Sequence, residues 1–387
     1  MVNATLHRNS PCRWHSMAAI ALMSAALTAC GGGGGSGTST SSGGSGNGSG
    51  NSSGGTNDSA LSGAYAYVTL SNNGAAGGDE PASGVGDFGT MTFDGAGNFT
   101  GTETVNSGGT ITADQSTSGT YAVTSSGSVT LGPLSGNVGA DGNTLVLAEM
   151  TSGEPPSMTV AIKEGGTTFS AASLQGSFTM ASLNNSGSSG LGSGSLLTLT
   201  FDGAGNFTGS ESQNDGGTVT SNGSASGTYS VTTSGSVTLT SSGGGALTGQ
   251  ISADGDTMVL GDLTSGDAPS LYVAIKQGTA TFSNASLDDS YSGATLQSAG
   301  ADGGISGLLS LTFDGAGSFS GTDSQNNGET VTTGTAVSGS YSVASGGSLT
   351  VSPNAVALTG EIGTDGDTVV LEDLNSGDPP SITVVIR

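Results

Sequence analysis

The chain has 387 residues, of which 72 are glycine, and its 30 acidic residues far outnumber its five lysines and arginines. Glycine does not recur at every third position, which excludes a collagen, and too few lysine, arginine, glutamate and leucine residues are present for a coiled coil. The scarcity of cations argues against a nucleic-acid partner, since binding to phosphates depends on lysine and arginine displacing counterions.

The beginning of the chain has the pattern of a secretory signal. Arg8 and Arg13 precede an apolar run from Met17 to Ala26. This run is too short to span a bilayer, which takes about 20 residues. A basic segment followed by a short apolar one is typical of a signal peptide, and we expect residues 1–29 to be removed.

The apolar segment ends in Leu27-Thr28-Ala29-Cys30. These four residues resemble the lipobox of bacterial lipoproteins, and the resemblance implies cleavage before Cys30 and acylation of that cysteine. Attachment by more than one acyl chain is stable. The resemblance also implies that an aspartate directly after the cysteine would retain the protein in the inner membrane. Because Gly31 follows Cys30, the resemblance implies an outer-membrane lipoprotein that faces the periplasm or the cell surface.

The next unit, residues 30–59, consists of this cysteine and a segment made almost wholly of glycine, serine, threonine and asparagine. Such a segment cannot bury enough apolar surface to offset the entropy that it would lose on folding. We expect it to form a flexible tether with an end-to-end distance of roughly 30 Å.

The remainder of the chain repeats one unit three times. The segment Phe93–Phe99, with the sequence FDGAGNF, recurs 108 residues later, and the related FDGAGSF follows after a further 112 residues. Tyr121, Tyr229 and Tyr341, each in a Gly-x-Tyr-x-Val segment, show the same two spacings. A period above 100 residues is that of a whole domain rather than of a solenoid repeat. We predict three domains, over residues 60–165, 171–278 and 284–387.

Each copy contains short segments in which apolar and polar residues alternate, as in residues 309–313. This alternation is typical of strands with one buried face. Turn residues such as Asp-Gly join the segments. The middle copy has eight candidates, near residues 174–182, 195–201, 207–214, 218–232, 236–241, 246–252, 257–262 and 270–276.

Eight consecutive antiparallel strands close most simply into an up-and-down barrel, which leaves no exposed edge. We therefore predict an all-β protein with three tandem eight-stranded barrels, and a two-sheet β-sandwich in each copy is the alternative. The Leu-x-Gly-x-aromatic starts at residues 61–65 and 174–178 resemble the lipocalin, or calycin, type of small barrel. An eight-stranded barrel is just wide enough to be filled by side chains or to hold one small ligand.

The mature chain offers little for catalysis. Both histidines and Cys12 lie within residues 1–29, so neither a Ser-His-Asp nor a Cys-His arrangement can form, and zinc sites built on histidine or cysteine are also excluded. Lys163 and Lys276 could each pair with a serine, but both end the last strand of a copy, where a solvated lysine is the simpler interpretation. We predict no catalytic residue, no cofactor and no enzymatic activity.

Asp94, Asp202 and Asp314 in the repeated segment are weak candidates for a metal site, because a carboxylate is a hard oxygen ligand for calcium. Asn98 and Asn206 offer further oxygens, but the spacing does not match an EF-hand loop. The interpretation that we favour is structural: aspartate and glycine supply the backbone of a hairpin turn.

A second set of acids, Glu103, Glu211 and Asp323, provides weak candidates for ligand binding. Each lies four residues after a phenylalanine that we expect to point inward, and strand alternation then places the acid on the same face. An acid inside a barrel is costly unless it binds something. However, a glycine lies between the two residues and often marks a bulge that reverses the alternation. We therefore expect the three acids to be exposed.

These observations favour a non-enzymatic outer-membrane lipoprotein that displays three β domains for surface or interaction roles, with the acidic charge keeping the domains apart. An alternative is a protein whose barrels each hold a small apolar ligand, and a weaker one is a carboxylate-dependent hydrolase. The partners that we expect are the membrane, through lipid on Cys30, and either a small apolar ligand or a protein, but not a nucleic acid.

Overall fold

The computed structural model describes residues 57–72, 84–166, 168–185, 191–298, 303–353 and 356–387. The expected signal peptide, Cys30 and most of the expected tether lie outside these described residues. The described chain is built almost wholly of β-strands, with three short 3₁₀ helices. None of its helices is long and apolar enough to cross a membrane.

The strands form three groups of eight, one for each repeat, which we call barrels 1, 2 and 3. Barrel 1 follows helix η1 (Asp58–Ala60) and contains β1 (Ser62–Ser71), β2 (Val85–Asp94), β3 (Asn98–Ser107), β4 (Thr110–Val123), β5 (Ser128–Leu131), β6 (Leu134–Val138), β7 (Thr144–Glu149) and β8 (Ser157–Lys163). Barrel 2 follows η2 (Ala171–Ser173) and contains β9 (Gln175–Asn184), β10 (Ser193–Asp202), β11 (Asn206–Asp215), β12 (Thr218–Val231), β13 (Ser236–Ser241), β14 (Ala246–Ile251), β15 (Thr257–Asp262) and β16 (Ser270–Lys276). Barrel 3 follows η3 (Asn284–Ser286) and contains β17 (Ser290–Gln297), β18 (Ile305–Phe313), β19 (Ser318–Asn326), β20 (Val331–Val343), β21 (Ser348–Pro353), β22 (Leu358–Ile362), β23 (Thr368–Asp373) and β24 (Ser381–Ile386).

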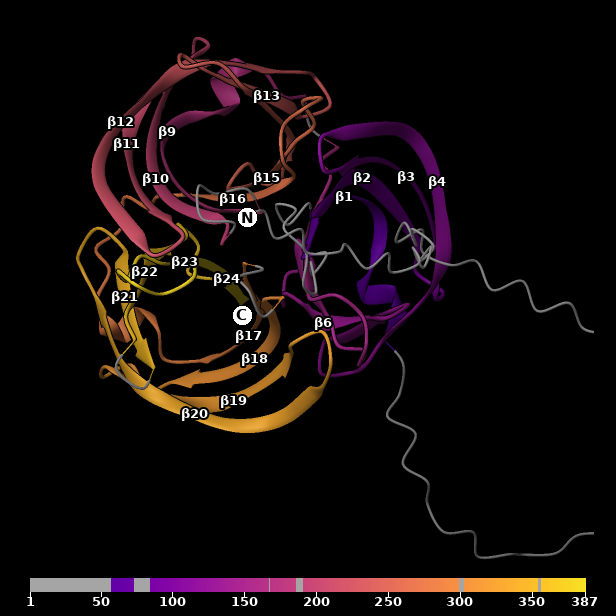
Figure 1. Ribbon diagram of the computed structural model, residues 1–387, viewed down its shortest axis with the longest axis vertical. Coiled ribbons are helices and arrows are strands. Elements are labelled where there is room, and N and C mark those ends of the chain that lie inside the picture. Colours follow the sequence, from indigo (N-terminus) through magenta and orange to yellow (C-terminus); the bar gives the residue numbers. More distant parts are fainter. Residues whose placement is uncertain (1–56, 73–83, 167, 186–190, 299–302, 354–355) are drawn as a thin grey trace, which may run out of the picture.

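Each group closes into an up-and-down antiparallel barrel (Figure 1). Neighbouring strands in the chain pair with each other, and the first strand also pairs with the last, so that β1 is hydrogen-bonded to both β2 and β8. The same closure joins β9 to β16 and β17 to β24. The predicted all-β fold of three eight-stranded barrels is confirmed. The sandwich alternative is wrong, because a closed sheet pairs the edges that a sandwich would leave open.

Aromatic side chains fill the interior of each barrel. In barrel 1 the ring of Phe93 meets Tyr65 and Tyr121 edge to face, with ring centroids 5.3 Å and 4.9 Å away. Phe201 and Phe313 occupy the same place in barrels 2 and 3 and make the same contacts. Such aromatic pairs contribute about 0.5–1.5 kcal/mol beyond the area that they bury. The repeated phenylalanines and tyrosines are therefore core residues.

The repeated tyrosine also closes one end of each barrel. The hydroxyl of Tyr121 donates to the carbonyl of Leu61 at 2.8 Å, just after helix η1. Tyr229 and Tyr341 donate to the equivalent carbonyls after η2 and η3. Each hydroxyl thus satisfies a backbone acceptor that a single helical turn leaves free, and it fixes the helix over the end of the barrel.

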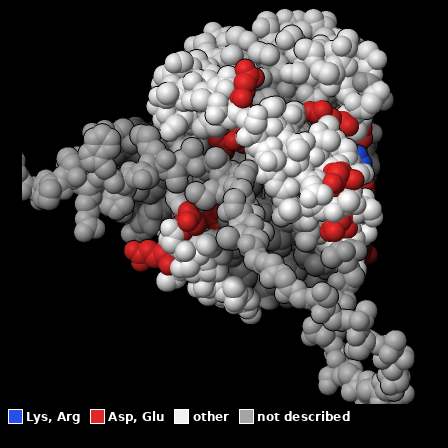
Figure 2. Space-filling model, turned by 90° about the vertical axis from the view of Figure 1, so that its right-hand side faces the viewer, with Lys and Arg blue, Asp and Glu red and all other residues white. Residues whose placement is uncertain are grey.

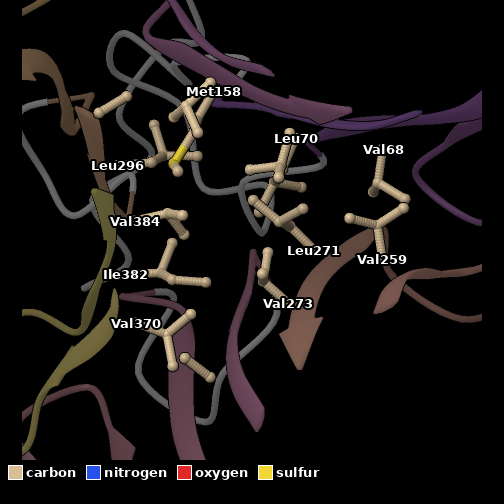
Figure 3. Close-up of a cluster of buried hydrophobic side chains, with 14 of the residues drawn as sticks. Val68, Leu70, Met158, Val259, Leu271, Val273, Leu296, Val370, Ile382 and Val384 are labelled. Atoms are coloured by element: carbon tan, nitrogen blue, oxygen red, sulfur yellow. The ribbon is translucent and has the colours of Figure 1, made fainter. Parts of the chain in front are cut away.

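The three barrels pack against one another around a common apolar cluster, which we call the shared core (Figure 1). Figure 3 shows Met158 of barrel 1, Leu271 of barrel 2 and Ile382 of barrel 3 among the side chains that gather there. The shared core consists of Val68, Leu70, Val146, Ala148, Met158, Val160, Ile162, Ala181, Leu183, Val259, Leu271, Val273, Ile275, Ala294, Leu296, Val370, Ile382, Val384 and Ile386.

The strands beside the shared core are buried on both faces. In β8, Ala161 packs inside barrel 1, whereas Val160 and Ile162 point outward into the shared core. A strand that is buried on both faces carries an almost continuous apolar sequence. The expectation that acidic charge keeps the domains apart is therefore wrong, because the faces that meet are apolar and their burial contributes about 25 cal/mol per Å².

Three buried asparagines connect the barrels in a cycle. Asn106 of barrel 1 donates through Nδ2 to two carbonyls at the end of β15 and in the loop after it, in barrel 2, at 2.9 Å and 3.1 Å. Asn214 of barrel 2 binds the same loop of barrel 3, and Asn326 of barrel 3 binds that of barrel 1. The third link returns to the first barrel, so the repeated contacts close into a ring. We name the contacts between barrels seam 1–2, seam 2–3 and seam 3–1.

Glu372 on β23 breaks the threefold pattern at seam 2–3. It occupies the position of Ala148 and Gly261 in the other barrels. It is fully buried, and neither carboxylate oxygen has a hydrogen-bond partner among the described residues. A Cβ atom added to Gly194 of barrel 2 would collide with Oε1, so the carboxyl lies directly against the neighbouring barrel. Burial raises the pKa of Glu372 well above its usual value, and the adjacent Asp373 charge adds to this shift.

We predict that Glu372→Gln changes the pH dependence of stability. The folded chain keeps the Glu372 proton at pH values where the unfolded chain has lost it, so this group lowers the free energy of unfolding by about 1.4 kcal/mol per pH unit above its ordinary pKa. Urea unfolding of the variant should match that of the wild type near pH 4, where both states are protonated, and the variant should be the more stable at pH 8. Glu154→Gln, at an exposed glutamate, should behave as the wild type. If the difference in free energy of unfolding between the wild type and Glu372→Gln is the same at pH 4 and pH 8, Glu372 does not have a raised pKa in the folded chain.

Candidate functional site

The aspartates of the repeated segment organise hairpin turns. Oδ1 of Asp94 accepts hydrogen bonds from the backbone N–H groups of Ala96 and Asn98, at 2.7 Å and 2.9 Å, and Oδ2 accepts one from the Asn98 amide at 2.7 Å. Asp202 and Asp314 bind the backbone of their own turns in the same way. These hydrogen bonds hold the pKa of all three carboxyls below the usual value.

This geometry favours the structural interpretation of the turn aspartates over the calcium one. Donors of the turn point at the carboxylate oxygens that a cation would need. In the described part of the chain, no group of three or more His, Cys, Asp or Glu side chains is placed to hold a metal ion. Asp94, Asp202 and Asp314 are therefore accounted for as turn residues.

The acids of the second set differ in their surroundings. Glu103 lies inside barrel 1 with 7% of its surface exposed, whereas Glu211 and Asp323 are half-buried. The hydroxyl of Tyr67 donates to Oε2 of Glu103. In barrel 2, the hydroxyl of Ser195 donates to Oε1 of Glu211 at 2.7 Å. The expectation of an exposed acid is thus wrong for Glu103.

The position of a bulge explains why Glu103 points inward. Strand β3 pairs with β2 in unbroken register from Phe99 to Ser107. On its other side, the register with β4 shifts between Glu103 and Val105, and the extra residue belongs to β4, where Asp114 has a φ of 56°. The bulge therefore leaves the alternation along β3 intact, and Glu103 stays on the face of Phe99.

Three ionisable side chains meet inside barrel 1: Asp87, Glu103 and Tyr67. Burial raises the pKa of Asp87 to about 8, and the charge of Glu103 adds to this shift. Burial also raises the pKa of Glu103, although the hydrogen bond from Tyr67 counteracts part of the effect. The pKa of Tyr67 is raised by burial and by the Glu103 charge. Because two carboxylates in apolar surroundings disfavour double ionisation, the pair retains a proton at neutral pH.

A cavity of about 30 Å³ lies beside this cluster. One water molecule needs about 10–15 Å³ and two to four polar partners, so the cavity has room for one or two water molecules and is too small for an organic ligand. The polar residues of its wall are Tyr67, Thr69, Asp87, Glu103, Glu149, Ser157 and Thr159.

Barrels 2 and 3 do not repeat the cluster. The position of Asp87 is occupied by Ser195 in barrel 2 and by Gly307 in barrel 3. Asp87 was not among the predicted site residues, although the sequence carries a signal for it. It precedes Phe93 by six residues, and an even separation along a strand places both side chains on one face.

In the described part of the chain, neither lysine is paired with a serine. Lys276 lies at the barrel rim with its Nζ 3.4 Å from Oδ1 of Asp256. Lys163 lies over the ring of Tyr65, 5.9 Å from the centroid. Cys30, the predicted lipidation site, is outside the described residues.

Comparison with known proteins supports the barrel type. The model of a family described as a lipocalin-like domain matches residues 174–260, which lie in barrel 2. Barrels 1 and 3 share the strand order and closure of barrel 2. The chain is thus similar to lipocalin-like barrels, repeated three times. No curated protein matches the chain.

Two solved structures of transferrin-binding protein B are among those similar to this chain. A Trp-176-Ala mutant from Haemophilus parasuis Hp5 is 12% identical, with a TM-score of 0.26, and the match covers 83% of this chain and 75% of that one. The isotype 1 protein from serogroup B Neisseria meningitidis is 10% identical, with a TM-score of 0.25, and the match covers 85% of this chain and 77% of that one. At these scores, neither similarity bears on the function of this chain.

The buried acids of barrel 1 predict a second pH effect. Asp87→Asn removes a group that is neutral in the folded chain and ionised in the unfolded chain between about pH 4 and 8, so it should remove a destabilisation of about 1.4 kcal/mol per pH unit in that range. Chemical unfolding at pH 5 and pH 8 should show that the variant loses less stability than the wild type on going to the higher pH. Asp114→Asn, at an exposed residue whose left-handed backbone suits both side chains, is the control. Equal losses in Asp87→Asn and the wild type would show that Asp87 is ionised in the folded barrel.

Proposed function

We propose that this chain is a non-enzymatic outer-membrane lipoprotein, anchored through Cys30, that presents a ring of three barrels for surface or interaction roles. The observation that carries the proposal is the filling of the barrels. The cavity inside barrel 1 has room for water alone, and clusters of buried aromatic and aliphatic side chains occupy barrels 2 and 3. A partner would therefore bind on the outer surface or at the seams between barrels.

The outer surface suits a soluble, displayed protein. Figure 2 shows separate groups of acidic side chains on a face that is otherwise mostly uncharged. Within the described residues, Val356 is the one large hydrophobic side chain exposed to solvent, with 38% of its surface accessible. A surface without an apolar patch does not drive aggregation or insertion into lipid. Recognition by such a surface depends on hydrogen bonds.

Support for the anchor comes from the N-terminal residues. The basic segment, the short apolar run and Leu27-Thr28-Ala29-Cys30 follow one another in the order of a lipoprotein signal. The glycine- and serine-rich residues that follow Cys30 would hold the ring away from the membrane. Acyl chains on Cys30 would supply the attachment, at about 0.8 kcal/mol for each buried CH₂ group.

The two alternatives have less support. A hydrolase that uses carboxylates would need substrate beside its acids, but Asp87 and Glu103 face a cavity of about 30 Å³. A barrel that holds a small apolar ligand would need an empty interior of a few hundred Å³. The aromatic side chains of Phe93, Phe201 and Phe313 occupy the places where such a ligand would lie.

We predict that Cys30→Ser releases the protein from membranes. Without the thiol no acyl chain can be attached, so the variant should appear in the soluble fraction and should not incorporate radiolabelled palmitate. Cys12→Ser is the matched control, because this cysteine precedes the expected cleavage site, and it should stay in the outer-membrane fraction. Retention of Cys30→Ser in the membrane would contradict lipid anchoring.

We also predict that the wild-type barrels take up no apolar probe. Crystals under xenon pressure should show no xenon inside a barrel, since xenon occupies only dry apolar cavities. Leu199→Ala provides a positive control: it removes a buried side chain from barrel 2, should cost about 2–5 kcal/mol and should create a cavity that binds xenon. Xenon inside a wild-type barrel would favour the alternative of a small apolar ligand.

A further inference from the structure

The chain covers two of the three seams with its own linkers. After β8, Glu164 donates its backbone N–H to Ala64 of barrel 1 and Phe169 donates to Thr233 of barrel 2, at 2.9 Å and 3.1 Å, so this linker bridges seam 1–2. After β16, Gln277 and Phe282 bridge seam 2–3 with equivalent backbone bonds. Seam 3–1 joins the last barrel to the first, and within the described residues no linker crosses it.

A cleft of about 330 Å³ lies at seam 3–1. Its size falls at the lower end of the roughly 300–1,000 Å³ of small-molecule sites. The wall contains six hydroxyl side chains, one amide, two leucines and no charged residue. Barrel 1 contributes Ser126, Ser128 and Asn137, and barrel 3 contributes Ser292, Leu308, Leu309, Ser310, Thr322 and Ser324.

Most polar side chains of the cleft make no side-chain hydrogen bond to any described residue. Within the described residues, five of the seven polar side chains in the wall make no side-chain hydrogen bond, and they come from both barrels. The other two are engaged, since Ser126 bonds to Thr124 and Ser324 accepts from the backbone of Gly334. Each free group can donate and accept hydrogen bonds. The five are Ser128, Asn137, Ser292, Ser310 and Thr322.

Two of the equivalent groups at the other seams are engaged. Gln250 stands at the position of Asn137, and its amide donates to the carbonyl of Ser234 at 2.7 Å. Thr179 stands at the position of Ser292, and its hydroxyl accepts from the linker residue Gln277 at 2.9 Å. A longer side chain at seam 1–2 and a linker residue at seam 2–3 thus each satisfy one group whose counterpart at seam 3–1 makes no side-chain hydrogen bond within the described residues.

We propose that the cleft at seam 3–1 binds a neutral saccharide of one to three sugar units, which deepens the proposed interaction role and rests on it. Sugar hydroxyls both donate and accept, as do the serine and threonine hydroxyls of the wall. Leu308, which packs on the outer side of β18 beside the shared core, offers apolar contact to the C–H face of a sugar ring. The wall has no cation to pair with an acidic sugar, and the formal charge of the chain, −25, repels anions.

A peptide fits this cleft less well than a saccharide. Peptides bind to β-proteins chiefly by adding a strand to a free sheet edge. Strands β5, β6, β17, β18 and β19, which line the cleft, are each paired on both sides within their closed barrels. The backbone N–H and C=O groups of these strands are thus hydrogen-bonded within the barrels. A ligand in the cleft would be recognised by side-chain hydroxyls.

The test titrates the full chain with chitotriose and maltotriose as neutral probes, with trigalacturonate as the acidic probe and with a neutral serine-glycine peptide. Saturation-transfer NMR and calorimetry should detect binding of at least one neutral trisaccharide, and neither the acidic probe nor the peptide should bind. Ser128→Ala combined with Asn137→Ala should weaken binding by about tenfold, because each lost hydrogen bond contributes about 0.5–1.5 kcal/mol.

The matched control is Ser236→Ala, which changes the counterpart of Ser128 at seam 1–2 and should leave saccharide affinity unchanged. Equal melting curves for all variants exclude a general loss of structure. The proposal is overturned if neither neutral saccharide binds up to about 50 mM, if the cleft variants bind as the wild type does, or if the peptide binds in their place. The fractionation of Cys30→Ser reports on anchoring alone, so failure of this proposal is distinguishable from failure of the lipoprotein assignment.

Discussion

Burial of the outward faces of β1, β7 and β8, and of their counterparts, is the constraint on which the rest of the structure depends. A small eight-stranded barrel can stand alone if its outer face is polar, as it is along β3 and β4. Here one side of each barrel is apolar outside as well as inside, and Val160, Val273 and Val384 can leave water only if the three barrels meet. The closed ring, the buried asparagines and the linkers all follow from that contact.

The strands could be predicted from the sequence, because period-two alternation and Asp-Gly turns are local signals. The segment expected at residues 195–201 is strand Ser193–Asp202 in the structure, and those at 257–262 and 270–276 agree at both ends. Interior residues could be predicted as well, since Phe93 and Tyr121 recur with the period of the domain. Barrel closure followed from the number of strands and from the cost of open edges.

The ring and the acids of barrel 1 could not be predicted in the same way. Two-sided burial shows in the sequence as strands with few polar residues, such as Leu145 to Ala148, but this pattern alone does not name the partner surface. The direction of Glu103 depended on which strand carries the extra residue of a bulge. That choice is made by the left-handed residue in β4, Asp114, and alternation along β3 does not reveal it.

The three barrels keep the same scaffold and differ at the points where chemistry is available. Residues that close the barrel or the ring recur in every copy, as Tyr121 and Asn106 do. Other residues that face a cavity or a seam differ between the copies: Asp87 has no acidic counterpart, and the buried carboxyl of Glu372 replaces alanine and glycine. A carboxyl buried without a partner among the described residues destabilises seam 2–3 once it ionises, whereas seam 3–1 leaves polar groups open to solvent. A ring built from equal parts thus acquires three unequal seams, and these differences give one chain distinct surfaces that a symmetric trimer of identical subunits would not have.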